Sequence, residues 1–215
     1  MSKYQIISMA AGILGANCHV LICAETKKAM VVDPGGWADE IKGKIDEAGA
    51  EVIMIVDTHG HWDHIGGNVE MQELTGAPIY IHEADGEFLQ NPELNLSTAF
   101  GRTGTGGHAA GLLHDGDVLQ VGNLTVKVIH TPGHTPGGIC LLCEDFLLTG
   151  DTLFKMSVGR SDLIGGDQAA LFRSLREKLK PLDPTLQVLP GHGPSSVLGE
   201  EVEKNPYFRL AERSL

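Results

Sequence analysis

Three histidines and one aspartate stand within six residues of each other, directly after a hydrophobic stretch. His59, His61, Asp63 and His64 belong to the segment DTHGHWDHIGG at residues 57–67, which follows the apolar run EVIMIV. Neutral imidazole and carboxylate groups are the ligands that zinc, iron and manganese accept in proteins. So dense a cluster is hard to explain by packing, and it predicts a metal site.

Three later segments also present a histidine or an aspartate in a Gly-rich or Pro-rich turn after an apolar run. They are TPGHTPGG with His134, LLTGDTLF with Asp151 and VLPGHGPSS with His192. Each residue alone would be an ordinary turn, cap or core residue. Beside the first cluster, they predict one shared site.

Spacing within the first cluster favours more than one ion. His59, His61 and Asp63 are two residues apart, and in an extended turn such residues project to one side. His64 would then point elsewhere, toward a second ion nearby.

The elements around these residues predict an α/β chain in which strands dominate each half. We expect strands over 4–9, 18–23, 29–33, 51–58, 78–82, 139–143, 146–151 and 186–193, a hairpin over 118–131 that turns at Gly122 and Asn123, helices over 37–49, 63–74 and 167–179, and a short helix at the C-terminus. Residues 91–114 are rich in Gly, Asn, Thr and Ser, and they predict a long loop of functional importance. The candidate metal-binding His and Asp residues follow predicted strands. We therefore expect helices outside a sheet sandwich, with the site at one edge, in a single domain over 1–215.

Charge and hydropathy exclude several classes of partner. The formal net charge is -12, and an acidic surface repels the phosphates of nucleic acids and anionic membranes. No stretch reaches the roughly 20 apolar residues that cross a bilayer. The apolar segment near the N-terminus is better explained by strands than by a signal peptide. We therefore expect a cytoplasmic protein that binds neither nucleic acid nor membrane.

Two other patterns indicate no chemistry. Cys140 and Cys143 have the spacing of a redox or zinc motif, but they fall in a predicted strand, where residues three apart point to opposite faces. The glycine-rich segment at 101–110 lacks the Lys-Ser/Thr pair of a phosphate loop. A nucleotide site is not expected.

The segments VDPGG, THGHWDH, TPGHTPGG, TGDTLF, GRSD and PGHGP, in this order, resemble the metallo-β-lactamase superfamily, and within it the short bacterial type of the glyoxalase II, or hydroxyacylglutathione hydrolase, branch. This resemblance covers nearly the whole chain. It implies a four-layer αββα sandwich with two divalent metal ions, zinc first, with iron or manganese also compatible. His59, His61 and His134 would bind one ion, Asp63, His64 and His192 the other, and Asp151 both.

The resemblance also implies an activity and a substrate. Hydroxide formed at the ions would hydrolyse a small-molecule thioester derived from glutathione, such as S-D-lactoylglutathione. Asp63 would orient the hydroxide. Arg160, in VGRSD, stands where the family places a basic substrate-binding residue, and Lys155 is a weaker candidate. The sequence ends 23 residues after His192, without the helical extension that supplies further glutathione contacts in longer members. Glutathione specificity is therefore less firmly implied than hydrolysis.

Three alternatives remain open from the sequence. A persulfide dioxygenase of the same fold would bind a single iron through His59, His134 and Asp151, a facial set of two histidines and one carboxylate. A lactone hydrolase would use the same two ions. A non-catalytic scaffold is disfavoured by the complete set of seven candidate ligands.

Overall fold

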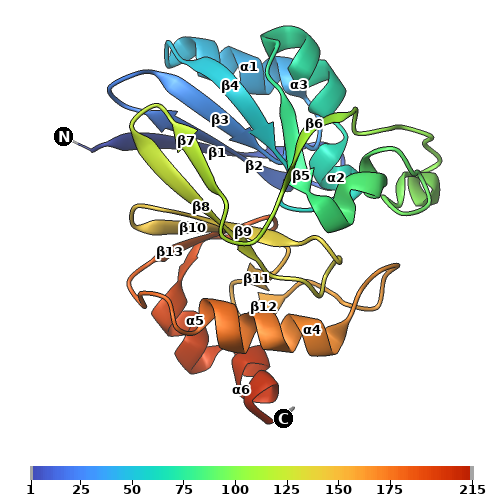
Figure 1. Cartoon of the computed structure of the whole chain (residues 1–215), viewed down its shortest axis with the longest axis vertical. Helices are drawn as coiled ribbons and strands as arrows, with labels where there is room; N and C mark the ends of the chain where they lie inside the picture. The colour runs from blue at the N-terminus through green and yellow to red at the C-terminus, as the bar shows by residue number, and fades with distance from the viewer. Residues whose placement is uncertain (1, 214–215) are drawn as a thin grey trace.

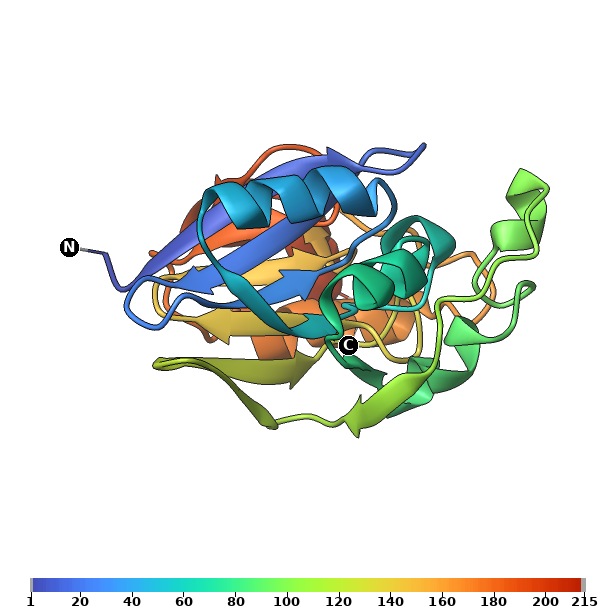
Figure 2. The ribbon, with the colours of Figure 1, turned by 90° about the horizontal axis from the view of Figure 1, so that it is seen from above.

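Two six-stranded β-sheets pack face to face, and helices cover the outer face of each (Figures 1 and 2). The structure is a computed structural model that describes residues 2–213. Figure 1 shows the helices of the N-terminal half above the first sheet and those of the C-terminal half below the second. The four layers confirm the αββα sandwich expected from the sequence.

The first sheet is mixed and has the order β1-β2-β3-β4-β5-β6. Its strands are β1 (Tyr4–Ala11), β2 (Ala16–Cys23), β3 (Lys28–Val32), β4 (Glu51–Val56), β5 (Ile79–His82) and β6 (Ala109–Leu113). The first three pair antiparallel, and β3 through β6 pair in parallel. Helices α1 (Ala38–Glu47), α2 (Trp62–Ile65) and α3 (Asn68–Thr75) supply the parallel crossovers, and the 3-10 segments η1 (Glu83–Leu89) and η2 (Ser97–Phe100) follow β5.

The second sheet has the order β14-β13-β10-β9-β8-β7. Its strands are β7 (Val118–Val121), β8 (Leu124–His130), β9 (Ile139–Cys143), β10 (Phe146–Gly150), β13 (Gln187–Pro190) and β14 (Ser196–Val197). A small hairpin, β11 (Leu153–Phe154) and β12 (Ser157–Val158), follows β10. The outer layer consists of α4 (Gln168–Arg173), the π-helical η3 (Ser174–Leu179), α5 (Leu198–Lys204) and α6 (Pro206–Arg213).

Three apolar layers separate the four layers of the fold. Strand β2 shows the alternation that produces them: Val20 and Ile22 pack toward the helices, whereas Leu21 packs between the two sheets. In β9, Cys140 faces the outer helices and Cys143 faces the other sheet. The two thiols therefore lie on opposite faces as predicted, and all four cysteines are free.

Strand direction determines where the site lies. Strands β3, β4 and β5 run in one direction in the first sheet. In the second sheet, β8 and β10 both pair antiparallel with β9 and so run parallel to each other, and β13 runs parallel to β10. The loops that follow β4, β8, β10 and β13 carry the seven candidate ligands, and they meet at one edge of the sandwich.

Several boundaries differ from those expected. The helix predicted over 63–74 is two helices, because Gly66 and Gly67 pass close to the β3–α1 loop, and a Cβ on Gly67 would lie 2.5 Å from the carbonyl oxygen of Pro34. The loop predicted over 91–114 contains η2 and the edge strand β6. Strands β11, β12 and β14 were not predicted. The hairpin turn at residues 122–123 is confirmed.

Among the helices of residues 2–213, none has both the length and the apolar character needed to span a membrane.

Candidate metal centre

All seven predicted metal ligands meet at the edge where the parallel strands end. His59 and His61 lie in the loop after β4, and Asp63 and His64 lie in the single turn of α2. His134 follows β8, Asp151 follows β10 and His192 follows β13. Each ligand loop begins at a strand whose position is fixed by the sheet, so side chains far apart in sequence are brought together.

The first group consists of His59, His61 and His134, and their ligand atoms lie within 4.8 Å of one another. Nδ1 of His61 is 2.9 Å from Nε2 of His134. Nε2 of His59 and Nε2 of His61 are buried and have no hydrogen-bond partner. Buried polar atoms without a partner are costly, and a cation held by this group would supply a partner for the lone pair of His59 Nε2.

The second group consists of Asp63, His64 and His192, again with ligand atoms within 4.8 Å of one another. Nε2 of His192 is 3.1 Å from Oδ2 of Asp63 and 3.3 Å from Nε2 of His64. The expectation that Asp63 projects with His59 and His61 is wrong. The chain is helical from Trp62 onward, so the alternation of an extended segment ends before Asp63, which joins His64 instead.

Asp151 lies between the two groups. Its Oδ2 is 3.4 Å from Nε2 of His134, and its Oδ1 is 3.4 Å from Nε2 of His64. Oδ1 is buried and accepts no hydrogen bond. A Cβ on Gly191 would lie 2.4 Å from this oxygen, so glycine is required there for the His192 loop to approach Asp151. Asp151 is therefore placed to contact both groups.

Hydrogen bonds behind the candidate ligands fix their orientation. Asp33, at the end of β3, accepts from Nδ1 of His64 at 2.9 Å. Thr58 donates its backbone N–H and its hydroxyl to the same carboxylate at 2.7 and 2.6 Å. His134 donates from Nδ1 to the carbonyl oxygen of Arg160 at 2.6 Å. These bonds leave Nε2 of His64 and of His134 with a lone pair that faces the site.

Asp33 could itself be counted as a ligand, because one of its oxygens lies within 4.8 Å of the ligand atoms of His59 and His64. Both of its carboxylate oxygens, however, already accept hydrogen bonds. We assign it the role of positioning His64. Sequence reasoning missed this residue, although its place at a strand end in VDPGG was the available signal.

Asp85 connects two of the ligand loops from behind. It is fully buried in η1, and its Oδ2 accepts from the backbone N–H of Gly60 at 3.0 Å while Oδ1 accepts from Gly137 at 2.6 Å. Gly60 lies between His59 and His61, and Gly137 lies in the loop of His134. Sequence reasoning missed Asp85, because nothing in the segment HEADGEF indicates contacts with such distant loops.

Electrostatics favour neutral imidazoles in the first group and a cation in the second. Burial and the neighbouring His134 lower the pKa of His61 to about 3. Burial, His64 and His134 lower the pKa of His59 well below its usual value. For His64, burial lowers the pKa, but Asp151, Asp63 and Asp33 outweigh it and raise it to about 10.

These features fit two divalent metal ions. Neutral imidazoles offer lone pairs, and the excess of carboxylates around His64 requires positive charge. The Nε2 atoms of His64 and His192 are 3.3 Å apart. Their lone pairs repel each other unless a proton or a metal ion lies between them. The residues present therefore match the chemistry of imidazole and carboxylate metal sites.

A cavity of about 530 Å³ opens above these residues. It is lined by Leu14, His61, Asp63, Asn95, Leu96, Ala99, Phe100, His134, Asp151, Phe154, Ser157, Val158, Arg160, Leu163 and His192. The predicted substrate-binding residue Arg160 is thus at the cavity, but its side chain is 63% exposed and its Nε is paired with Asp162 at 2.7 Å. Lys155 is exposed in the β11–β12 turn and is not among the lining residues.

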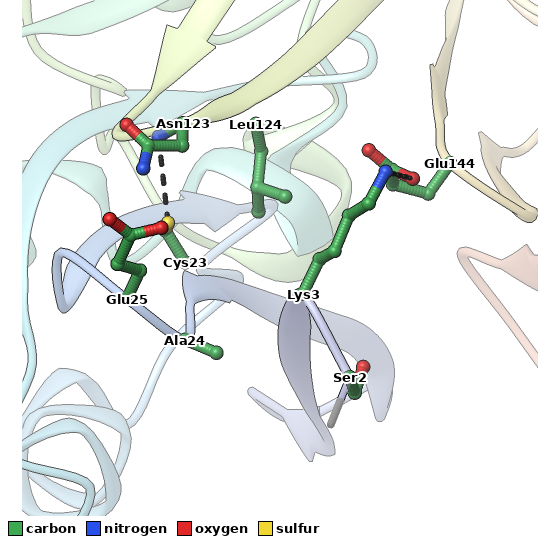
Figure 3. Close-up of a pocket in the computed structure, with 8 residues that line it drawn as sticks. All are labelled: Ser2, Lys3, Cys23, Ala24, Glu25, Asn123, Leu124 and Glu144. Atoms are coloured by element: carbon green, nitrogen blue, oxygen red, sulfur yellow. Dashed lines mark hydrogen bonds and ion pairs between the residues drawn. The ribbon is translucent and has the colours of Figure 1, made fainter.

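A second cavity, also about 530 Å³, lies at the opposite end of the sandwich, among turns such as β7–β8 and β9–β10 (Figure 3). Its Lys3 is paired with Glu144 at 2.9 Å, and Cys23 Sγ accepts from the backbone N–H of Asn123 at 3.5 Å. It contains none of the predicted site residues.

Comparison with known proteins agrees with this geometry. A family model described as the metallo-beta-lactamase superfamily matches residues 11–192. The chain belongs to the metallo-β-lactamase superfamily. The matched range begins at the end of β1 and includes all seven candidate ligands, so the superfamily expected from the motifs is confirmed.

Two relatives that align with most of the chain are named as hydrolases. The chain is 35% identical to a Bacillus subtilis protein named "Probable metallo-hydrolase YqgX", over 93% of this chain and 95% of the relative. It is 31% identical to the hydroxyacylglutathione hydrolase GloC of Haemophilus influenzae, over 89% and 92%.

Solved structures of the superfamily share the architecture. The BLEG-1 B3 metallo-β-lactamase has a TM-score of 0.90 and 35% identity, over 94% of this chain and 99% of that one. TTHA1623, in a di-iron-bound form, has a TM-score of 0.82 and 30% identity, over 94% and 100%. The chain is therefore a metallo-hydrolase of this superfamily, and a solved relative binds two metal ions.

Proposed function

We propose that this metallo-hydrolase cleaves thioesters, with a glutathione thioester as the first substrate to test. In the reaction, the oxygen of water forms a bond to the carbonyl carbon, and the carbon–sulfur bond breaks. The products are a carboxylate and a thiol, and the protons of water are shared between the thiol and the solvent. The observation that carries the proposal is the pair of ligand groups that meet at Asp151 on the floor of an open cavity.

Metal ions held by the two groups would lower the pKa of a coordinated water toward neutrality and polarise a substrate carbonyl. His59, His61 and His134 would bind one ion, and Asp63, His64 and His192 the other. Asp63 is the candidate for orienting the attacking water, because it lines the cavity and its Oδ2 lies 3.1 Å from Nε2 of His192 in the second group. A thiolate with a solution pKa near 8.5 can leave without a strong general acid, consistent with a cavity in which Asp63 and Asp151 are the acidic lining residues.

Support for a glutathione thioester comes from the relative GloC, whose name gives hydroxyacylglutathione as its substrate. Arg160 is the proposed contact for a substrate carboxylate, since it lines the cavity. It would have to exchange its pairing with Asp162 for the substrate. Lys155 lies outside the lining and would act only at longer range.

The presence of the second ligand group favours the two-metal hydrolase over the single-iron dioxygenase. A site of His59, His134 and Asp151 alone would leave the Asp63, His64 and His192 group without a function. Zinc is the first metal to test, and the di-iron form of TTHA1623 supports iron as the second.

The test is turnover of S-D-lactoylglutathione by purified protein, with metal content measured on the same sample. We expect hydrolysis that a chelator abolishes and added zinc restores. Protein that contains two equivalents of zinc or iron and hydrolyses none of a panel of glutathione thioesters would overturn the proposal. Oxygen uptake with glutathione persulfide by iron-loaded protein would then identify the dioxygenase.

A further inference from the structure

Exposed and half-buried apolar side chains line the active-site cavity. They come from four separate segments: Leu14 from the β1–β2 turn, Leu96 and Phe100 from the segment around η2, Phe154 from β11, and Leu163 from the loop before α4. We call these five residues the apolar collar. Leu14 is 46% exposed and Phe100 is 42% exposed. Four segments far apart in sequence thus place apolar surface on one opening.

The collar is held in position from below. The backbone N–H of Trp62, at the start of α2, donates to the carbonyl oxygen of Asn95 at 2.8 Å, and the Asn95 side chain donates to Phe88 at 2.9 Å. Gly104 lies directly against the Trp62 ring, which a Cβ would enter at 2.1 Å. Leu96 and Phe100 are therefore anchored to the helix that carries Asp63 and His64. In Figure 2 their segment (light green) extends beyond the ends of the sheets on the side of the ligand loops.

Cationic side chains are scarce in the cavity. Among the lining residues of the described chain, Arg160 is the one arginine or lysine, and both its Nε and Nη2 donate to Asp162 at 2.7 and 2.8 Å. A substrate bound in the cavity lies against the collar, because the collar residues and the metal ligands line the same space. The collar offers it dispersion contacts and removal of apolar surface from water, whereas an anionic group must first displace Asp162 from Arg160.

We propose that the preferred substrates are thioesters whose acyl group is a hydrocarbon chain or ring, and that the collar binds this group. The inference rests on the proposed thioester hydrolysis and specifies the acyl half of the substrate. The scissile carbonyl lies at the ligand groups, the acyl chain extends along Leu14 and Phe100, and the hydrolysis releases a carboxylate with an apolar tail. A short hydroxyacyl group such as lactoyl would leave the collar in contact with water.

The decisive experiment keeps the thiol constant and varies the acyl group. Acetyl-, butyryl-, hexanoyl- and D-lactoylglutathione are compared with the zinc-loaded protein. A fully buried methylene is worth about fourfold in binding, so we expect kcat/KM to rise by about two- to fourfold for each added methylene. Hexanoylglutathione should exceed the lactoyl thioester by about tenfold or more. A flat or falling series would overturn the inference while leaving thioester hydrolysis intact.

Matched variants locate the effect. Leu14→Ser and Phe100→Ser should each reduce the ratio of hexanoyl to acetyl turnover by about threefold or more. Leu74→Ser in α3 makes the same change at a leucine that is 40% exposed but does not line the cavity, and it should leave the ratio unchanged. The ratio of hexanoyl to acetyl turnover does not depend on the fraction of the protein that is active, because both substrates are measured on the same preparation. If both collar variants keep the wild-type ratio, the collar does not bind the acyl chain.

A binding measurement separates this inference from the proposed function. Butyrate, hexanoate and octanoate have the form of the acid product, and their affinities for the zinc-loaded protein are measured by calorimetry. We expect tighter binding with length, and a weaker dependence in Phe100→Ser. This result, together with no turnover of any thioester, would reject thioester hydrolysis and keep an apolar-chain site. Affinity that is independent of length would reject the collar as a chain-binding surface.

Discussion

Asp151 differs from the other candidate ligands because its two carboxylate oxygens face different groups. Oδ2 lies near His134 and Oδ1 near His64, each at 3.4 Å. Replacement of Asp151 by alanine removes the charge that both groups share. We expect metal content to fall from two equivalents toward one or fewer. Turnover should fall by about 100-fold or more, which corresponds to a loss of about 3 kcal/mol of transition-state stabilisation.

The measurement is metal analysis and thioester turnover on the same preparation. Asp39→Ala is the control, since Asp39 is an exposed aspartate in α1 that does not line the cavity and belongs to neither ligand group. An Asp151→Ala protein with two equivalents of metal and unchanged turnover would contradict the two-metal mechanism.

At the scale of single residues, the sequence predicted the candidate ligands because each one follows an apolar strand and has a chemically distinctive side chain. It did not predict Asp33 or Asp85. Their roles come from hydrogen bonds to backbone and imidazole groups in loops 25 to 52 residues away, and a single carboxylate in a turn carries no sign of such partners. The same limit applies to the collar, whose leucines and phenylalanines resemble ordinary core residues until the fold exposes them.

At the scale of elements, the ligand loops after β4 and β8 belong to different sheets, and Asp85 joins them. Asp85→Asn keeps the size of the side chain but turns one acceptor oxygen into an NH₂ donor that faces a backbone N–H. One loop then loses its hydrogen bond, so His59 and His61 are no longer fixed relative to His134. We expect about 10- to 100-fold weaker metal affinity, as for other residues that orient ligands, together with a loss of about 1–3 kcal/mol in stability.

Metal titration and urea unfolding of Asp85→Asn separate these two effects. Asp57→Asn is the matched control: Asp57 is also fully buried, and its Oδ2 accepts from Asn68 while Oδ1 accepts no hydrogen bond. Burial raises the pKa of Asp57 well above its usual value, so a neutral amide is a close substitute. If Asp85→Asn loses stability but keeps its metal affinity, Asp85 supports the fold and does not position the ligands.

Element prediction succeeded where periodicity was strong and failed where tertiary contacts decide. The apolar pattern of the sequence correctly predicted the long strands and the helix at 38–47. Apolar spacing alone predicted one helix over 63–74, but the close approach of Gly67 to the β3–α1 loop divides it. Strand β6 has the sequence AAGLL, with little β-propensity, and it is a strand because its backbone pairs with β5.

At the scale of the whole molecule, a pair of stacked histidines lies between the two sheets. His82 ends β5 of the first sheet and His130 ends β8 of the second, with ring centroids 3.9 Å apart and ring planes at 14°. Nδ1 of His82 accepts from the backbone N–H of Ala84 at 3.2 Å, and His130 contacts the carbonyl oxygen of Pro136 through Nε2 at 2.9 Å. Nδ1 of His82 therefore has no room for a proton without loss of this bond.

This contact makes the packing of the sheets sensitive to acid. Burial and His130 lower the pKa of His82 to about 4, against the weaker opposing effect of Glu83. As pH falls below about 6.5, the unfolded chain gains a proton at His82 that the folded protein does not bind until about pH 4. Stability is therefore lost across this interval, by an amount on the order of 1–2 kcal/mol for this residue.

Replacement of His82 by asparagine should remove that loss. Asparagine retains an acceptor for the N–H of Ala84 and carries no titratable proton. On metal-free protein, the difference in free energy of unfolding between pH 7 and pH 4.5, measured with urea, should be smaller in His82→Asn than in the wild type. The exposed His108→Asn should behave like the wild type. Since His19, His59 and His61 also have lowered pKa values, some acid sensitivity should persist in the variant. An unchanged difference would mean that the stacked pair does not couple the two sheets to pH.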